Sequence, residues 1–407
     1  MIRRLAFWGA ASTLAITYVG FPALTALRAQ LVRRPVRVAD ITPSVSVVIA
    51  ARNEAGMIGP RIDNLLALDY PPDRLEIVVA SDGSTDGTDE IVASYADRGV
   101  RLVSPGRVGK GAALGAAVAA ASGDILVFSD ANSRCAPGAV RALVRPLADP
   151  SVGGVAGNQV YLDADGGSDH AAGERGYWDL DRLIKRAQSA SGSVTSGTGA
   201  IYAIRRELFE PIPEGVTDDM LNTIRVVDRR LRLVFAEDAV AYESVAPSSA
   251  LEFDRKVRIM TRSFSCLLVM RRLFDPRRTG FYAAQLFWHK VLLRATAVPL
   301  AALLVTAPLL WRHGLVYRVA TIGQAVSYAL AAAGLLLGDR PAARSKPLAV
   351  PAYYVLVNTA AVRAAWNLVR SAGIDRWEPR RAAGDGLVPF AESGDRDDRF
   401  EPESEVA

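Results

Sequence analysis

VSVVIAARNE at residues 45–54, LEIVVASDGSTD at 75–86 and DILVFSDAN at 124–132 decide the fold of this 407-residue chain. Each stretch opens with apolar, largely β-branched residues and closes with polar ones, which is the pattern of a buried strand that leads into a loop. A fourth such run begins at Val100, and segments with helical spacing lie at residues 54–68, 86–97, 111–121 and 136–148. This alternation predicts an α/β fold with a mostly parallel sheet and helices on both faces.

A ligand site is expected where these strands end. In open parallel sheets, ligands bind beyond the carboxyl ends of the strands. Three polar clusters fall at such ends: Arg52-Asn53-Glu54, the Ser81–Asp86 run, and Ser129-Asp130-Ala131-Asn132. The sequence therefore predicts that these clusters converge on one bound molecule.

The composition excludes several classes of protein. Cys135 and Cys266 are the only cysteines, which rules out a disulfide framework and a cysteine-based zinc or iron–sulfur site. Three histidines leave little room for a histidine-rich metal centre. Half of the chain is hydrophobic, the net charge is +5, and many arginines lie near apolar stretches. This pattern fits the cytoplasmic face of a membrane and predicts no nucleic-acid partner.

The N-terminal segment is expected to cross a membrane. Residues 5–27 carry no charge, and at about 1.5 Å per residue they can span a hydrocarbon core of about 30 Å. The basic flank after this run is heavier than the one before it, which places the following domain inside the cell. A cleaved signal peptide is the competing interpretation, and the length of the apolar run argues against it.

Apolar runs return near the C-terminus, at residues 295–311, 315–338 and 347–369. The segment 273–294 mixes aromatic and basic residues, which suits a helix in the membrane interface or a buried amphipathic helix. One N-terminal and three C-terminal spans would place the C-terminus outside, whereas the arginines from Arg370 onward favour the inside. The sequence leaves the number of spans open.

Six motifs occur in order along the chain: VSVVIAARNEAGMI, SDGSTDGT, GKGAALGAA, FSDANS, SGTGAIYAIRRELF and VTDDM. Together they resemble family 2 glycosyltransferases, above all the membrane-bound members related to cellulose and hyaluronan synthases. The resemblance covers roughly residues 42–265. It implies a GT-A nucleotide-sugar-binding domain that transfers a sugar, with inversion, from a nucleoside diphosphate sugar such as a UDP-sugar.

With this resemblance, the chain divides into five expected parts. Residues 1–38 would form a transmembrane helix and a basic linker, and 39–272 the catalytic domain. Residues 273–294 would form the interfacial helix, 295–372 the C-terminal transmembrane helices, and 373–407 a basic and then acidic disordered tail. The enzyme would lie in the cytoplasmic membrane with its catalytic domain inside. Its expected partners are the donor, a glycan or lipid-linked acceptor, membrane lipids and further subunits of a polysaccharide synthesis complex.

The resemblance assigns the donor contacts to four residues. It places Asp82 on the nucleobase, although an aspartate here can also simply form a turn. Asn53 and Glu54 stand where the family contacts the nucleotide, and capping of the next helix explains them equally well. Lys110, between two glycines, is expected to meet the diphosphate, and a solvated lysine is the alternative. The surrounding glycines do not have the spacing of a Walker A loop.

A metal site is expected at Asp130-Ala131-Asn132, which resembles the D-x-D motif of the family. Residues two apart on an extended segment point to one side, so two oxygens can converge on one hard cation. Mg²⁺ or Mn²⁺ held by few protein oxygens together with donor phosphates fits this pattern. The departure is Asn132, because its amide carries no charge. Either metal affinity is lower, or Asp130 is the only direct ligand.

The catalytic base is expected at Asp219. Thr217-Asp218-Asp219 resembles the T-E-D motif, in which the second acid deprotonates the acceptor hydroxyl and Asp218 plays a supporting part. Adjacent carboxylates repel each other, which raises the proton affinity of the pair and suits a base. Plain N-capping of the following helix is the alternative.

Two further motifs complete the expected site. Residues 255–259 correspond to the Q-x-x-R-W motif, which places Arg258 on the leaving diphosphate. Ile259 replaces the tryptophan that supports the acceptor sugar, which puts processive polymerisation in doubt more than transfer itself. Gly197, Thr198 and Gly199 resemble the acceptor-side segment of the family, although a tight turn would look the same.

Two other functions stay possible. One is a sugar-phosphate nucleotidyltransferase on a similar nucleotide-binding scaffold. Its glycine-rich signature would directly follow the first strand, where Ala51-Arg52-Asn53-Glu54 stands instead. The other is a non-catalytic membrane subunit of a synthase complex, which the presence of Asp130 and Asp219 disfavours.

Overall fold

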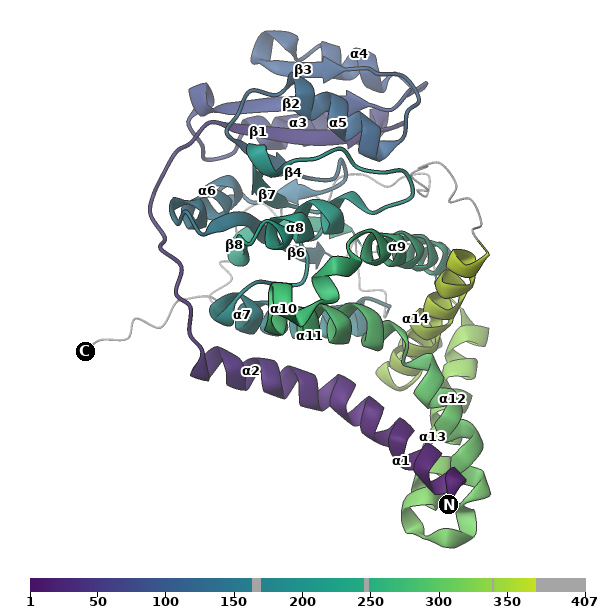
Figure 1. Cartoon of the computed structure of the whole chain (residues 1–407). Coiled ribbons are helices and arrows are strands. Elements are labelled where there is room, and N and C mark those ends of the chain that lie inside the picture. Colours follow the sequence, from purple (N-terminus) through teal and green to yellow (C-terminus); the bar gives the residue numbers. More distant parts are fainter. Residues whose placement is uncertain (163–169, 245–248, 339, 371–407) are drawn as a thin grey trace, which may run out of the picture.

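The computed structural model describes residues 1–162, 170–244, 249–338 and 340–370 and is built on an eight-stranded sheet (Figure 1). The strand order is β3-β2-β1-β4-β7-β6-β8-β5. The strands are β1 (Val45–Ala51), β2 (Leu75–Ser81), β3 (Val100–Val103), β4 (Ile125–Phe128), β5 (Arg134–Cys135), β6 (Val152–Leu162), β7 (Tyr202–Arg205) and β8 (Arg232–Ser244).

The expected α/β architecture is confirmed, and its sheet is mixed. β3, β2, β1 and β4 run parallel, with Val45 of β1 in register with both Leu75 and Ile125. β7 then pairs antiparallel with β4 and with β6. β6 and β8 pair parallel, and the short β5 closes the edge antiparallel to β8. The first half of the sheet therefore has the parallel arrangement that places strand ends and loops at one edge.

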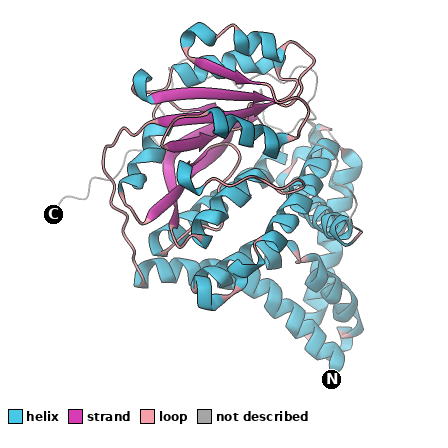
Figure 2. Ribbon diagram, turned by 45° about the horizontal axis from the view of Figure 1, so that its top comes forward, coloured by secondary structure: helices cyan, strands magenta, loops and turns pink. Residues whose placement is uncertain are grey.

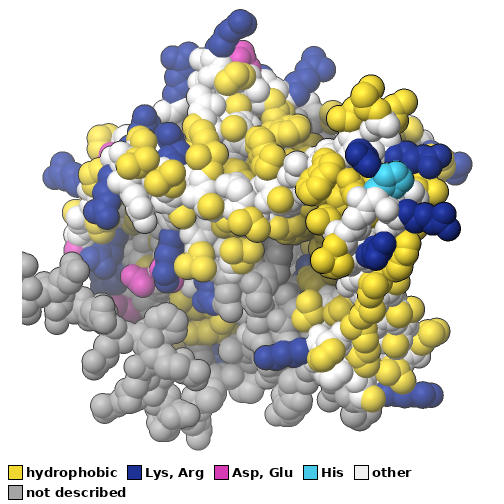
Figure 3. All heavy atoms as spheres, turned by 90° about the horizontal axis from the view of Figure 1, so that it is seen from below, with side chains coloured by type: hydrophobic (Ala, Val, Ile, Leu, Met, Phe, Trp, Pro, Cys, Tyr) yellow, Lys and Arg dark blue, Asp and Glu magenta, His cyan; other side chains and the backbone are white. Residues whose placement is uncertain are grey.

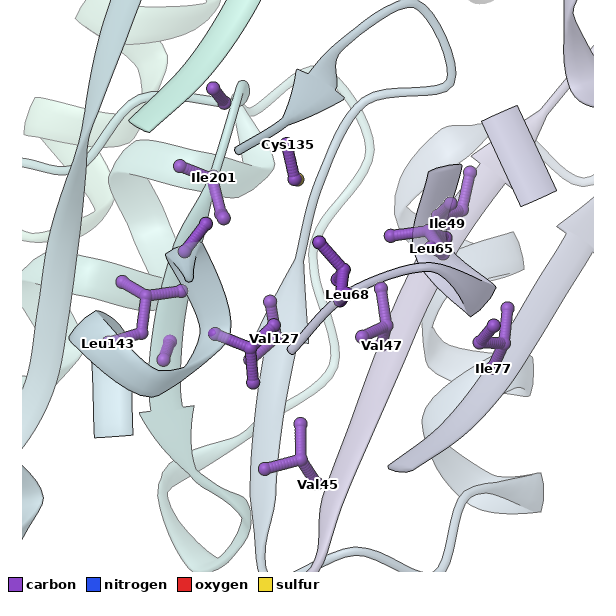
Figure 4. Packing of buried hydrophobic residues seen from close by; sticks show 14 of the residues in the cluster. Val45, Val47, Ile49, Leu65, Leu68, Ile77, Val127, Cys135, Leu143 and Ile201 are labelled. Carbon is purple, nitrogen blue, oxygen red and sulfur yellow. The ribbon is translucent and has the colours of Figure 1, made fainter. Parts of the chain in front are cut away.

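The core forms on both faces of the sheet because side chains alternate along each strand. In β1, Val47 and Ile49 belong to one cluster, whereas Val48 belongs to a second cluster on the other face. Figure 4 shows the first cluster, in which side chains of β1 and β4 meet those of the covering helices. These helices are α3 (Ala55–Leu66), α4 (Thr88–Ala93) and α6 (Ala139–Val144), whereas α5 (Lys110–Ala120) packs on the other face, in the second cluster.

Figure 2 shows helices gathered around the strands of the sheet, and three more of them pack against its mixed half or against one another. They are α7 (His170–Ser191), α8 (Asp218–Asp228) and α9 (Ser249–Val269). A third apolar cluster joins α8 and α9 to the short helix α11 (Phe281–Leu286), through residues such as Leu221, Cys266 and Leu286. The start of α8, where the expected base lies, is thereby fixed against α9 and α11.

The apolar segments form helices that are long enough to cross a membrane. α1 (Ile2–Ala15), a π-helical turn and α2 (Phe21–Leu31) make one helix of 30 residues. α13 (Leu315–Leu337) and α14 (Lys346–Val369) are further candidates. The segment Phe281–Arg294 and α12 (Ala297–Leu309) form a pair bent by 55°, so the described residues hold three candidate spans, or up to four.

The expected interfacial segment contains α10 (Pro276–Thr279) and, after Gly280, the helical stretch Phe281–Arg294 that begins with α11, rather than one continuous helix. The expected disordered tail, residues 373–407, lies outside the described residues.

Candidate active site

Asp82, directly after β2, is fully buried and fastens the loop that precedes α5. Its Oδ1 accepts hydrogen bonds from the backbone N–H groups of Val108 at 2.7 Å and Gly109 at 2.6 Å. Its Oδ2 pairs with the Arg107 guanidinium at 3.0 Å. Three donors thus fill three of the about four acceptor positions of this carboxylate, which leaves little of it for a nucleobase.

Asn53 and Glu54 tie the loop after β1 to the loop after β2. Asn53 adopts a positive φ of 51°, and its Oδ1 accepts a hydrogen bond from the Thr85 N–H at 2.9 Å. The backbone N–H of the buried Glu54 donates to Thr88 Oγ1 at 2.8 Å. Glu54 occupies the N-cap position of α3, yet its side chain makes no capping hydrogen bond. The two strand-end loops thus form one connected surface beside Asp82.

Lys110, the first residue of α5, connects Asp130, which follows β4, to Asp218 at the start of α8. Its Nζ lies 2.8 Å from Asp130 Oδ1 and 3.1 Å from Asp218 Oδ2. Burial would lower the pKa of Lys110, but attraction to Asp130 and then to Asp218 outweighs burial and raises the pKa above its ordinary value. The lysine is therefore a fixed positive charge at the centre of the site.

The loop at residues 196–199 is wedged between Asp130 and α8. The Asp130 N–H donates to the Gly199 carbonyl at 3.0 Å. A Cβ added at Gly199 would lie 2.5 Å from Asp130 Oδ2, so a larger residue there would force the Asp130 side chain or the loop to move. The Gly197 N–H donates to Thr223 Oγ1 of α8 at 3.0 Å. Thr198 Oγ1 is buried and has no hydrogen-bond partner among the described residues.

The donor set at Asp130 and Asn132 fits a hard cation that binds mainly through other oxygens. The Asp130 side chain is 33% exposed, and Asn132 two residues later is partly exposed. No group of three or more acidic, histidine or cysteine residues that could hold a metal occurs in the described part of the chain. Mg²⁺ or Mn²⁺, which keep waters and bind donor phosphates, suit such a sparse site.

Asp218 and Asp219 begin α8, with Thr217 at the N-cap position. Asp219 Oδ1 accepts from Thr217 Oγ1 at 2.5 Å and from the Met220 N–H at 2.7 Å. Burial, followed by the negative charge of Asp218, raises the pKa of Asp219. Both of these hydrogen bonds are made to Oδ1 and neither involves Oδ2. One carboxylate oxygen is thus held while the other can accept a proton.

The basic residues of α9 separate into two groups. Arg255 and Lys256 form ion pairs with Glu252 of the same helix, at 2.7 Å and 3.0 Å. Burial lowers the pKa of Arg262, and attraction to Asp218 opposes this effect, which places Arg262 near the catalytic acids. Arg258 lies one turn before Arg262 and so shares its face of the helix.

The sequence indicates Arg262 as one of a basic cluster that suits either a diphosphate or anionic lipid. Two other residues that the structure brings to the site are not indicated by the sequence motifs. Arg107 pairs with Asp82, and its proximity to Lys110 in the sequence is the available signal. Glu243 of β8 accepts hydrogen bonds from Ser133 and Gln159, and burial together with the charge of Asp130 raises its pKa to about 7. No local sequence pattern marks Glu243.

Comparison with known proteins identifies the domain. The model of the family described as Glycosyl transferase family 2 matches residues 46–212. These residues form a family 2 glycosyltransferase domain. The matched segment contains Asp82, Lys110, Asp130 and the loop at 196–199.

The fold is of the GT-A type. Mannosyltransferase PcManGT from Pyrobaculum calidifontis, solved in complex with GDP-Man and Mn²⁺, matches 90% of this chain and 100% of its own. The TM-score is 0.67 and the sequence identity is 26%. The likeness therefore extends beyond the family 2 domain into the flanking helices.

Curated relatives match at similar identity. A beta-monoglucosyldiacylglycerol synthase of Synechocystis sp. is 26% identical over 52% of this chain and 46% of its own length. An N-acetylglucosaminyltransferase of Rhizobium sp. is 26% identical over 70% of this chain and 67% of its own. The chain spans about half the length of the first curated relatives that it matches.

Proposed function

We propose that this protein is an inverting glycosyltransferase that moves a sugar from a nucleoside diphosphate sugar to a hydroxyl of a glycan or lipid-linked acceptor at the cytoplasmic membrane. The observation that carries the proposal is the contact of Lys110 with both Asp130 and Asp218. This contact joins Asp130, the expected metal ligand, to Asp218, the neighbour of the expected catalytic base Asp219. A non-catalytic subunit would not need this junction, and a nucleotidyltransferase would not need Asp219.

In the proposed reaction, Asp219 Oδ2 takes the proton of the acceptor hydroxyl. The hydroxyl oxygen attacks the anomeric carbon from the side opposite the leaving group, and a new C–O bond forms. The bond from the anomeric carbon to the diphosphate oxygen breaks, and that oxygen keeps the electron pair. Because one displacement occurs, the anomeric configuration inverts. Thr217 and the Met220 N–H hold Asp219 Oδ1 and so aim the base.

The positive charges of the site serve the leaving group. Lys110 and Arg258 would contact the diphosphate, and Arg262 adds charge near Asp218. A bound Mg²⁺ or Mn²⁺ would neutralise charge that develops on the departing nucleoside diphosphate. Asp130 and Asn132 are the residues that would hold this cation. Asp82, Asn53 and Glu54 would form the nucleotide end of the cleft.

The donor is proposed to be a UDP-sugar. The resemblance to synthases that use UDP-sugars favours it, whereas the structural relative was solved with GDP-Man. An adjacent membrane supports a lipid-linked acceptor, and one relative is named for the synthesis of a glycolipid. The three or four apolar helices support a location in the membrane.

The underside of the molecule also supports the location in a membrane. Figure 3 shows hydrophobic side chains over much of this face, with lysine and arginine side chains among them. Leu27 and Leu31 of α2 and Leu183 of α7 are all exposed, although they belong to helices that pack together. Basic residues follow α2 directly, which favours a cytoplasmic catalytic domain.

A donor screen tests this function. The purified full chain in lipid is incubated with Mn²⁺ or Mg²⁺ and a panel of UDP- and GDP-sugars, and release of the nucleoside diphosphate is measured. We expect turnover of one donor class and its loss in Asp219→Asn. The proposal fails if no donor turns over with any acceptor fraction, or if Asp219→Asn equals the wild type.

A further inference from the structure

The buried face of α3 contains a charge that the proposed chemistry does not use. Arg61 is fully buried, at 0% exposure, and its guanidinium has no carboxylate partner among the described residues. Its Nε has no hydrogen-bond partner there either. A buried charge without a counter-charge is costly, and an apolar residue of similar volume would avoid that cost. Packing and stability alone therefore do not explain an arginine at this position.

The contacts of Arg61 lead to the segment that carries the metal motif. Its Nη2 donates to Ser129 Oγ at 2.6 Å, directly before Asp130. Both terminal nitrogens lie 3.5 Å from the Sγ of Cys135, at the other end of the segment. Figure 4 shows Cys135 among the side chains of the main core. One guanidinium thus touches both ends of residues 129–135, which we call the metal loop.

Asn64, one turn after Arg61, holds the far end of the metal loop in two places. Its Oδ1 accepts from the Cys135 N–H at 2.9 Å, and its Nδ2 donates to the Cys135 carbonyl at 2.9 Å. Arg61 Nη1 in turn donates to Asn64 Oδ1 at 2.8 Å, which orients the amide. The side chain of Asn64 therefore pairs with Cys135 as a neighbouring strand would.

The same contacts extend to the acceptor side. Ser129 Oγ, which accepts from Arg61, donates to the Ala200 carbonyl at 2.5 Å. Ala200 follows Gly199, whose Cα faces Asp130 too closely to admit a Cβ. A shift of the Arg61 guanidinium would therefore move Asp130 and the loop at 196–199 together.

We propose that Arg61 and Asn64 are positioning residues that hold the metal loop at both ends, so that Asp130 and Asn132 are arranged for the cation before the donor binds. The inference rests on the proposed metal role of Asp130. It explains how a site with one carboxylate and one amide can bind a cation: rigidity replaces a second charge. Residues that orient metal ligands from outside typically change affinity by about 10- to 100-fold when removed.

The test measures Mn²⁺ affinity directly. The full chain in lipid is titrated with Mn²⁺ in the presence of UDP, and in a second series of GDP, while electron paramagnetic resonance reports the Mn²⁺ that stays free in solution. Arg61→Gln, Asn64→Ala and Ser129→Ala are compared with Arg98→Gln. This control removes an exposed guanidinium that pairs with Asp63 of α3, the helix that also contains Arg61. Thermal unfolding identifies variants that do not fold.

We expect Mn²⁺ affinity to fall about tenfold or more in the first three variants and to stay unchanged in Arg98→Gln. In activity assays, the Mn²⁺ concentration for half-maximal rate should rise by a similar factor, with kcat at saturating Mn²⁺ changed much less. If Arg61→Gln is unstable, Asn64→Ala, at a partly exposed position, carries the test.

Asp130→Asn separates the two proposals. If Asp130→Asn binds Mn²⁺ as the wild type does, the proposed metal role itself fails. If Asp130→Asn loses the metal while folded Asn64→Ala and Ser129→Ala bind it with wild-type affinity, the positioning role is overturned and the proposed function stands.

Discussion

At the scale of single residues, the proposed base Asp219 and its neighbour Asp218 are expected to set the pH range of the reaction. Asp219 must be deprotonated to act as a base, and its pKa is raised by burial and then by Asp218. As the solution is acidified, Asp219 is therefore expected to take up its proton, and activity to fall, at a higher pH than with a base of ordinary carboxylate pKa. Asp218→Asn removes the like charge and lowers the pKa of Asp219, so the acidic limb of the pH–kcat profile should move to lower pH.

The matched control for this prediction is Asp228→Asn, which removes the acid at the other end of α8, where it pairs with Arg272. That variant should leave the acidic limb in place. A limb that stays fixed, or that moves to higher pH in Asp218→Asn, would show that Asp219 is not the titrating base.

Gly199 is the residue at which the site tolerates least change. Its added Cβ would stand 2.5 Å from Asp130 Oδ2, which is well inside contact distance. In Gly199→Ala, Asp130 or the loop must move, and a shift of about 1 Å at a reacting centre can reduce the rate about a hundredfold. We expect this loss in kcat together with weaker Mn²⁺ binding, while thermal unfolding changes little.

Gly192→Ala serves as the control, because its nearest neighbour, the Gln188 carbonyl oxygen, would lie 4.0 Å from the new Cβ. This variant should retain wild-type kcat. Equal activities of the two alanine variants would mean that Gly199 does not constrain Asp130.

At the scale of elements, α11 and the turn that follows it hold the segment that leads into the loop at 196–199. Tyr282 donates to the Thr195 carbonyl at 3.3 Å, Gln285 donates to the Ser193 carbonyl at 3.4 Å, and His289 Nδ1 lies 2.9 Å from Thr195 Oγ1. A helix of the candidate bent span thus positions the segment before the proposed acceptor-side loop. The nucleotide end is built from α3, α5 and the first strands instead.

Thr195→Val tests this division. It removes the hydroxyl that contacts His289, and the loss of one hydrogen bond of about 1 kcal/mol predicts a roughly fivefold rise in the KM of the acceptor. Hydrolysis of the donor without acceptor should not change. Thr279→Val, which removes a hydroxyl that bonds only within its own turn, should alter neither quantity. A change in the KM of the donor would contradict the assignment.

The sequence predicts best those elements with a strong hydrophobic pattern. β1 and β2 are predicted to within a few residues because buried parallel strands appear as continuous apolar runs, and α3 because its apolar residues recur at helical spacing. β6 and β8 were not predicted, since β6 contains Gly153, Gly154 and Gly157 and β8 carries several charges. Their strands form because neighbours supply the pairing, which no local pattern records.

The candidate site shows the same boundary. Motif order was enough to name Lys110, Asp130 and Asp219 as members of one site. It could not show that Lys110 contacts Asp218, or that Arg61 reaches the metal loop, because these partners lie far apart in the sequence. Such contacts are consequences of tertiary packing and need coordinates.

At the scale of the whole molecule, the apolar helices separate into two groups. α1, α12 and α13 share a cluster that includes Phe7, Leu303 and Tyr317, and Figure 1 shows them projecting away from the sheet. α14 packs along α13 and also along α9 and α7, with Ala360 and Ala364 buried beside α9. The most apolar stretch of α14 is 39% buried, against 11% for that of α13, so α14 is less exposed to lipid than its hydropathy suggests.

This arrangement predicts three crossings, by the helix Ile2–Leu31 that contains α1, by the bent pair that contains α12 and by α13, with α14 at the membrane surface. The C-terminal end of α14 then lies on the same side as the catalytic domain, as the basic residue Arg370 after α14 favours. The turn that contains Arg312, between α12 and α13, lies on the opposite side.

Labelling of introduced cysteines with a membrane-impermeant maleimide measures these positions, and Cys135 and Cys266 give little background because both are buried. In intact cells, Arg312→Cys should react, whereas Arg370→Cys and Arg98→Cys should react only after lysis. Because Arg98 belongs to the catalytic domain, it calibrates the cytoplasmic side. Reaction of Arg370→Cys in intact cells would mean that α14 crosses the membrane and that the protein has four spans.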